Sequence, residues 1–211
     1  MSDSNQVCGY TEEEANLPDG IPPVACEEPT WEDRNQCLWH AETPQKPVDM
    51  LADRWEDSAN RIDGIFLKGL RLGDRIDFSN KTLYAGNFRG ADLIEANFQG
   101  AQLDSACFRE ATLRSASFNG DRTSLRKAQF EDSECVDTRF QHATLHNANF
   151  KSANLSSAKF QQADAADAAF VDSKLHDAKL IRANFRSAEL DRAELHQSDC
   201  GKANFEGASL K

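Results

Sequence analysis

The sequence lacks any apolar run long enough to cross a membrane, and it shows no signal peptide. A soluble, cytoplasmic protein is therefore expected. Thiols stay reduced in that compartment, so the six cysteines are not expected to form a disulfide framework.

Motifs of common enzymes are missing as well. The sequence has no Ser-His-Asp arrangement, no glycine-rich loop to cradle a phosphate, and no pair of carboxylates in a plausible cleft. We therefore expect a protein that is not an enzyme and has no catalytic residues.

A period of five dominates the chain after Asn60. A Leu or Phe recurs at every fifth position with a small residue two places before it, as in Ala91-Asp92-Leu93. Nine such centres run from Phe78 to Phe118 and, after one step of seven, eighteen run from Leu125 to Leu210, which gives 27 units. Neither a helix nor a simple strand has a period of five, so these units must stack as in a solenoid.

This pattern resembles that of the pentapeptide-repeat family, whose unit is A-(D/N)-L/F-x-x. The resemblance implies an all-β solenoid, a right-handed quadrilateral β-helix with one pentapeptide per side and four per coil. The repeat domain is predicted over residues 63–211, and its 27 units would form nearly seven coils. At about 4.8 Å between stacked strands, the rod would be roughly 30 to 35 Å long.

Residues twenty apart would lie above one another, so phenylalanines should form two columns on opposite sides. One column comprises Phe88, Phe108, Phe130, Phe150 and Phe170, and the other comprises Phe98, Phe118, Phe140 and Phe160. Offset rings can stack along such columns. Ala165 precedes Phe185 in its own column, so the larger ring is expected to fill the volume that the alanine leaves.

Three cysteines and one insertion interrupt the pattern. Cys135 and Cys200 occupy central positions and Cys107 lies beside one, where each is expected to act as a small hydrophobe. The step of seven adds two residues around Asn119-Gly120-Asp121, a turn-prone sequence that should bulge from one corner.

The net charge of −11 is not spread evenly over the chain. Residues 1–62 hold 14 acidic and 4 basic side chains, whereas residues 63–211 hold 21 and 20. One outward column of the rod, at Arg139, Lys159 and Lys179, is even basic. A protein that imitates DNA should carry a continuous negative field along its length, and this rod does not.

Four residues of the N-terminal segment are typical zinc ligands: Cys8, Cys26, Cys37 and His40. Three thiolates and one imidazole form a complete tetrahedral set, and the C-x-x-H spacing lets one tight turn present two of them. Segment 1–42 has too few apolar residues to build a core, so a structural Zn²⁺ would explain how it folds. An acidic tail with incidental cysteines is the alternative.

An amphipathic helix is predicted over residues 43–62, starting at Pro44 or Pro47. Its apolar positions at helical spacing are Val48, Leu51, Trp55, Ala59 and Ile62. We expect this helix to cap an irregular first coil centred on Leu67 and Leu72, with Trp55 as the plug. A helix that binds a partner is the alternative.

The opposite end of the rod has no predicted cover, because the repeat runs to Leu210 and the sequence stops at Lys211. Open backbone edges favour pairing. The expectation is therefore either a homodimer through the C-terminal end or a longer protein of which this chain is a fragment.

All rod histidines, namely His142, His146, His176 and His196, are predicted to point outward. His176 and His196 should stack on successive coils with Asp177 nearby, an arrangement capable of binding a metal or a proton weakly. Solvated surface histidines are the interpretation we favour for all four.

The repeat predicts a scaffold that mediates protein–protein interaction through the faces or an end of a rigid rod. No direct binding to nucleic acid or membrane is expected. The family resemblance leaves one alternative, a DNA mimic that binds a type II topoisomerase such as gyrase. Metal handling by the N-terminal segment is another.

Overall fold

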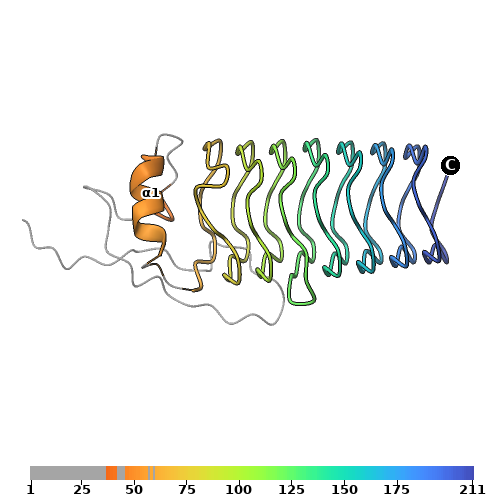
Figure 1. Cartoon of the computed structure of the whole chain (residues 1–211), viewed down its shortest axis with the longest axis horizontal. Coiled ribbons are helices and arrows are strands. Elements are labelled where there is room, and N and C mark those ends of the chain that lie inside the picture. Colours follow the sequence, from red (N-terminus) through yellow and green to blue (C-terminus); the bar gives the residue numbers. More distant parts are fainter. Residues whose placement is uncertain (1–36, 42–45, 57, 59) are drawn as a thin grey trace, which may run out of the picture.

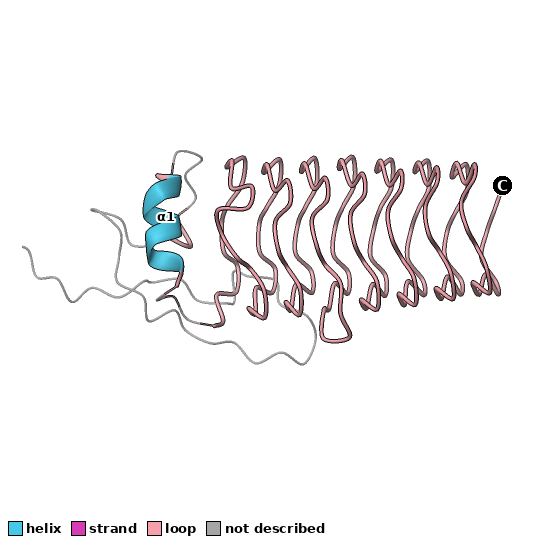
Figure 2. Cartoon of the chain, in the orientation of Figure 1, coloured by secondary structure: helices cyan, strands magenta, loops and turns pink. Residues whose placement is uncertain are grey.

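The computed structural model describes residues 37–41, 46–56, 58 and 60–211. These residues form a rod of stacked coils with the helix α1 (Val48–Trp55) at one end and the C-terminus at the other (Figure 1). The coils are drawn as loops in Figure 2 because each side contributes only an isolated bridge residue to the pairing. Among the described residues, no helix is long and apolar enough to cross a membrane.

Parallel bridges set the register of the coils. Over most of the rod they join residues twenty apart, such as Asn149 and Ala169. At each corner the chain makes a tight turn, as where the amide of Ala96 donates to the carbonyl of Leu93 at 3.1 Å. The residue before that amide, Glu95, has a φ of 61°, and the same left-handed conformation recurs at corner after corner. The predicted quadrilateral β-helix is confirmed.

Stacked aromatic rings fill the centre of the rod. The Phe88 and Phe108 rings lie 4.8 Å apart in one column, and Phe98 and Phe118 lie 4.7 Å apart in the other. The columns meet edge to face, with 5.6 Å between the Phe88 and Phe98 centroids. Each pair gains about 0.5 to 1.5 kcal/mol beyond its burial, so the columns stabilise the rod along its whole length.

The small residues of the core differ in burial, and Cys107 and Cys200 are only partly buried. Ala165 is fully buried, and the Phe185 ring lies 5.3 Å from Phe170 and 6.2 Å from Phe160. Cys135 is fully buried as well, and this burial raises the pKa of its thiol to about 12. Such a thiol is unreactive and serves as a small apolar side chain.

The two-residue insertion lengthens one corner without disturbing the stack. Bridges such as Gln102–Ser124 join residues 22 apart, and the extra residues project as a longer loop (Figure 1). Thr123 anchors this loop, because its Oγ1 accepts from the Gly100 amide at 2.8 Å and donates to the Asn119 carbonyl at 3.0 Å.

The helix α1 covers the first coil through aromatic contacts. Trp55 is buried, its ring lies edge to face with Phe78 at 4.9 Å, and its Nε1 donates to the Asp77 carbonyl at 2.5 Å. The Trp39 ring adds a further layer, 5.4 Å from that of Trp55. Trp55 therefore plugs the rod, and Trp39, which the sequence did not point to, covers the plug.

Helix α1 is shorter than the predicted span of 43–62. Ile62 belongs to the first coil instead, where its amide donates to the carbonyl of Thr82 at 2.8 Å. This pairing with the next coil is incompatible with a continued helix, while Ala59 and residues 42–45 lie outside the described residues. The predicted centres Leu67 and Leu72 are fully buried.

The first coil is irregular, as predicted. Its bridges span 21 residues, as in Arg71–Asp92, and the regular spacing of 20 begins at Asp77–Asn97. At the far end of the rod the Phe205 ring stacks on Phe185 at 5.2 Å, and Leu210 is 56% exposed.

Candidate functional surfaces

Residues 37–41 and 46–56, which include helix α1, form what we call the N-terminal cap. Two of the four predicted zinc ligands lie in it. Cys37 and His40 are both buried, with the Cys37 Sγ atom 3.2 Å from Nδ1 of His40. His40 Nε2 lies 2.7 Å from the Asp63 carbonyl. A carbonyl only accepts, so Nε2 donates to it, and in the neutral imidazole Nδ1 then has a lone pair on the side of Cys37. Cys8 and Cys26 lie outside the described residues.

This arrangement fits a metal site as far as it is described. A ligating histidine usually donates its other ring N–H to a carbonyl or carboxylate, which fixes the tautomer. Asp63 has that role for His40. Cys37 and His40 can therefore present a thiolate and an imidazole nitrogen to the same ion.

A buried lysine, Lys46, lies in the same cap. Its Nζ donates to the carbonyl of Trp39 at 2.9 Å and to that of Phe66 at 2.5 Å. Burial lowers the pKa of Lys46 to about 7, and the nearby Cys37 opposes this shift. A neutral lysine amine has two N–H groups, one for each of these two carbonyls. Sequence reasoning missed this residue because lysines are rarely buried.

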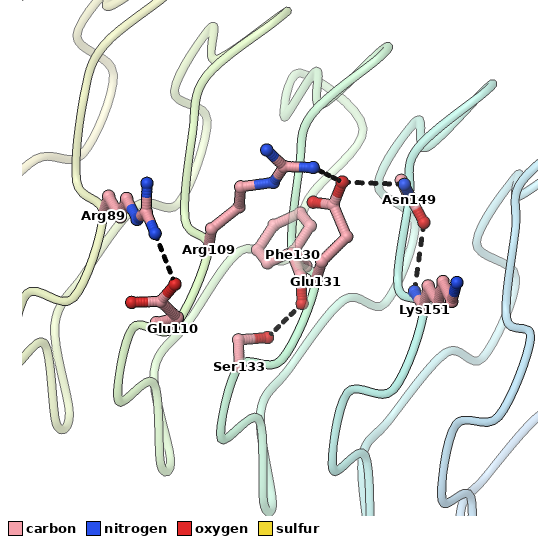
Figure 3. Close-up of polar contacts among 8 residues, drawn as sticks. All are labelled: Arg89, Arg109, Glu110, Phe130, Glu131, Ser133, Asn149 and Lys151. Atoms are coloured by element: carbon pink, nitrogen blue, oxygen red, sulfur yellow. Dashed lines mark hydrogen bonds and ion pairs between the residues drawn. The ribbon is translucent and has the colours of Figure 1, made fainter.

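Charged side chains lie on successive coils along one side of the rod (Figure 3). This side carries the residues that come directly after the phenylalanines of one column, such as Phe130. We call this surface the charged edge; it comprises Arg89, Arg109, Glu110, Glu131 and Lys151. Ion pairs of 2.6 Å join Arg89 to Glu110 and Arg109 to Glu131. The hydrogen bond from Arg89 is the main cause that lowers the pKa of Glu110. Each pair links neighbouring coils, so the charges are held by the stack.

Glu131 is the most enclosed member of the charged edge, with 8% of its surface exposed. Its Oε1 accepts from Arg109 at 2.6 Å and from Asn149 Nδ2 at 2.8 Å, whereas its Oε2 has no hydrogen-bond partner (Figure 3). Asn149 in turn accepts from the Lys151 amide at 3.1 Å. A buried carboxylate oxygen without a donor costs free energy.

The basic column predicted from sequence is present but partly neutralised. Arg139, Lys159 and Lys179 are successive bridge residues, and Asp199 follows them. Lys159 pairs with Asp137 at 2.8 Å. This column therefore carries side chains of both signs, which agrees with the nearly neutral charge of the rod.

The histidines point outward, and three of the four meet a carboxylate through an imidazole nitrogen. His142 lies 3.3 Å from Asp121, His146 lies 2.6 Å from Asp164, and His176 lies 2.7 Å from Glu194. The rings of His176 and His196 are adjacent, as predicted, with centroids 5.2 Å apart. The acidic residue beside them is Glu194, not the expected Asp177.

A shallow hollow of about 310 Å³ opens on the side of the rod opposite the charged edge. It forms where Gly201 has no side chain to continue the row of Gln161 and Ile181, and Arg182, Asp199 and Lys202 lie around it. It is open and carries no cluster of nucleophilic or acid–base groups that would indicate catalysis.

The chain matches a known family of repeats over most of the rod. The profile of the pentapeptide repeats matches in eight copies over residues 87–120, 123–162, 133–170 and 173–211, which is more than half of the chain. Residues 121 and 122, within the inserted loop, fall between two matched segments. A comparison with curated proteins finds no match.

Several solved structures are similar. HetL, a pentapeptide repeat protein involved in heterocyst differentiation regulation in the cyanobacterium Nostoc, is 21% identical over 78% of this chain and 97% of its own, with a TM-score of 0.44. QnrB1, a plasmid-mediated fluoroquinolone resistance protein, is 18% identical over 72% and 93%, with a TM-score of 0.34. A thylakoid-lumen protein of Arabidopsis thaliana is 26% identical over 56% and 70%, with a TM-score of 0.24.

Proposed function

Because the chain belongs to the pentapeptide-repeat family, we propose that it is a non-enzymatic scaffold whose charged edge binds another protein. The observation that carries this proposal is the set of side chains around Glu131. They are positioned by ion pairs and hydrogen bonds between coils, and the side chains of Arg89, Arg109 and Lys151 stay exposed beside them.

The charges of this edge define the chemistry of the partner. Arg89, Arg109 and Lys151 are exposed and lie at the spacing of the coils, with Glu110 between them. A protein surface that places carboxylates beside the two arginines would complement it. Arginine is also the residue most suited to bidentate pairing with carboxylates. Coil stacking fixes these side chains before binding, which lowers the entropic cost of association.

The alternative, a DNA mimic that binds gyrase or another type II topoisomerase, has less support. It requires a negative surface along the rod, but residues 63–211 carry 21 acidic and 20 basic side chains. An assay of DNA supercoiling separates the two proposals. A scaffold leaves gyrase activity unchanged, whereas a DNA mimic inhibits it.

The cap is proposed to contain a structural Zn²⁺ bound by Cys8, Cys26, Cys37 and His40. Its support is the facing of Cys37 Sγ and His40 Nδ1 across 3.2 Å. Metal analysis should find that Cys37→Ser loses one zinc per chain and unfolds the cap, while the coils remain folded. Equal metal content in the variant would contradict the site. Zinc exchange without any loss of fold would instead favour metal handling.

A homodimer through the C-terminal end is proposed as the contact between copies. Leu210 is exposed there, and Leu195 and Phe205 are only partly buried. Phe205→Asp should convert a dimer into a monomer in light scattering after gel filtration. A monomer in the unsubstituted protein would contradict this contact.

Charge reversal tests the scaffold proposal. The tagged protein is used to capture partners from the cells that produce it, alongside Arg89→Glu and Arg114→Glu. Arg114 is the matched control, since it pairs with Glu134 at 3.7 Å on another side of the rod. A partner retained by the control and lost by Arg89→Glu, whose ion pair with Glu110 is as exposed as that of the control, supports the proposal. Equal capture by both variants would overturn the assignment to the charged edge.

A further inference from the structure

Three potential metal ligands converge near the C-terminal end of the rod. Ligand atoms of His176, Glu194 and His196 all lie within 4.8 Å of one another. His176 Nε2 lies 2.7 Å from Glu194 Oε2, and the two imidazole rings meet edge to face at 77°. None of these side chains belongs to the charged edge or to the N-terminal cap.

The backbone holds the three residues in place. The amide of Leu175 donates to the Glu194 carbonyl at 2.8 Å, and the amide of Asp177 donates to the His196 carbonyl at 3.0 Å. The two histidines therefore occupy equivalent positions on adjacent coils of a rigid frame. The ligand atoms can therefore approach one another only by rotation of the side chains. The side chains of Glu194 and His196 are exposed, so they have room to rotate.

From this geometry we propose that His176, Glu194 and His196 bind a divalent transition-metal ion, with Zn²⁺ as the commonest candidate. Two imidazoles and a carboxylate are a usual protein set for this ion, and a three-ligand site leaves a coordination position open. At Zn–N and Zn–O distances of about 2.0 to 2.2 Å, ligand atoms in a tetrahedral site lie about 3.3 to 3.5 Å apart. The ion would replace the proton between His176 and Glu194.

The adjustment needed is small. The hydrogen-bonded pair at 2.7 Å must separate by less than 1 Å, and a pair as far apart as the 4.8 Å limit must approach by roughly 1 to 1.5 Å. Lys174, the bridge partner of Glu194, brings a positive charge that opposes the ion. Its replacement by alanine is therefore expected to strengthen binding.

The open position gives the site a role that the other surfaces lack. Water fills it in the isolated protein, and a histidine, carboxylate or thiolate of a second protein would replace that water. The site is thus an attachment point whose strength depends on metal supply. This inference does not rest on the charged edge being an interface.

Calorimetric titration of the full-length protein with Zn²⁺ tests the proposal. His196→Ala and Glu194→Gln are compared with the control His146→Ala. This control also removes an imidazole that meets a carboxylate, that of Asp164 at 2.6 Å, but His146 is not part of the three-ligand cluster. The first two variants should lose one binding event or bind at least about tenfold more weakly, the scale seen for loss of even an outer-sphere partner. His146→Ala should titrate like the unsubstituted protein.

Co²⁺, used in place of Zn²⁺, shows where the ion binds. Its absorption spectrum distinguishes this site from one formed by the cysteines of the N-terminal segment. Thiolate ligands give intense near-ultraviolet charge-transfer bands, whereas imidazole and carboxylate ligands do not. We expect Co²⁺ to broaden the amide NMR signals of residues 175–177 and 194–197, and this broadening should vanish in His196→Ala. Broadening unaffected by that substitution, or zinc binding equal in all variants, would overturn the site.

Discussion

The rings of Phe108 and Phe130 stack in parallel with their centroids 5.0 Å apart, although the two-residue insertion lies between them in the sequence. The bridge beside them, Cys107–Gln129, joins residues 22 apart where the regular coils join residues 20 apart. The rings therefore stay in register, and the extra residues form a longer loop at one corner. Core packing, not uniform repeat length, determines the register of this rod.

Deletion of Gly120 and Asp121 should therefore be tolerated. The shortened sequence restores an uninterrupted spacing of five, because Thr123 then occupies the small position before Leu125 directly after one regular corner. We expect the free energy of unfolding to change by less than about 1 kcal/mol, since shortening a surface loop has a small entropic effect. Denaturant unfolding measures this change, and a loss of several kcal/mol would show that the loop supports the core.

Loss of a central ring should be far more damaging. Phe130 stacks on Phe108 and on Phe150, the latter at 4.6 Å, so Phe130→Ala is expected to cost about 3 to 5 kcal/mol. Phe205→Ala, measured at a concentration at which the chain is monomeric, is the control, because Phe205 is only partly buried and stacks on Phe185 alone among the described rings. Similar losses in the two variants, measured by denaturant unfolding, would contradict a stability that depends on two-sided stacking.

Sequence alone predicted the core almost completely, since a period of five fixes which residues point inward. It placed Phe88 and Phe108 in one column, positioned the insertion and identified Trp55 as the plug. It overestimated the helix because Ile62 fits helical spacing and a coil equally well. Only the pairing of its amide with the next coil decides between them.

The surface was harder to predict because it depends on contacts between coils. Asp177 was expected beside His176 since it is adjacent in sequence, but the carboxylate that meets His176 is that of Glu194, eighteen residues later. The same separation joins His146 to Asp164. The burial of Lys46 had no signal in the sequence, because its enclosure comes from Trp39 and Phe66 together.

The two ion pairs of the charged edge should differ in strength. Arg89→Ala is expected to leave stability unchanged, because both Arg89 and its partner Glu110 are about half exposed. Arg109→Ala is expected to cost about 1 kcal/mol or more, since it removes a donor from Glu131, whose side chain is 10% exposed. Thermal unfolding of the two variants compares them. A larger loss for Arg89→Ala would contradict the enclosed environment of Glu131.

The cap should become more stable as the pH rises. Burial lowers the pKa of Lys46 to about 7 from the ordinary 10.5, so between these values the unfolded chain binds more protons than the folded one. The free energy of unfolding of the cap should rise across that window, by at most about 1.4 kcal/mol per pH unit, and fall as the pH drops through 7. Tryptophan fluorescence during denaturation at constant metal content measures it.

Lys46→Met provides the matched control for this pH dependence, because methionine fills a similar volume without a titrating group. The slope between pH 7 and 10.5 should disappear in this variant. A slope that persists unchanged would show that another group is responsible.

Photo-crosslinking tests most directly whether the charged edge is an interface. A photoreactive residue replaces Lys151 on that edge or, as control, Arg182 on the opposite side of the rod; both positions are exposed. If the charged edge is an interface, position 151 should give a discrete crosslinked protein that is absent from position 182 and lost when Arg89→Glu is added. The same products from both positions, or none from position 151, would contradict it.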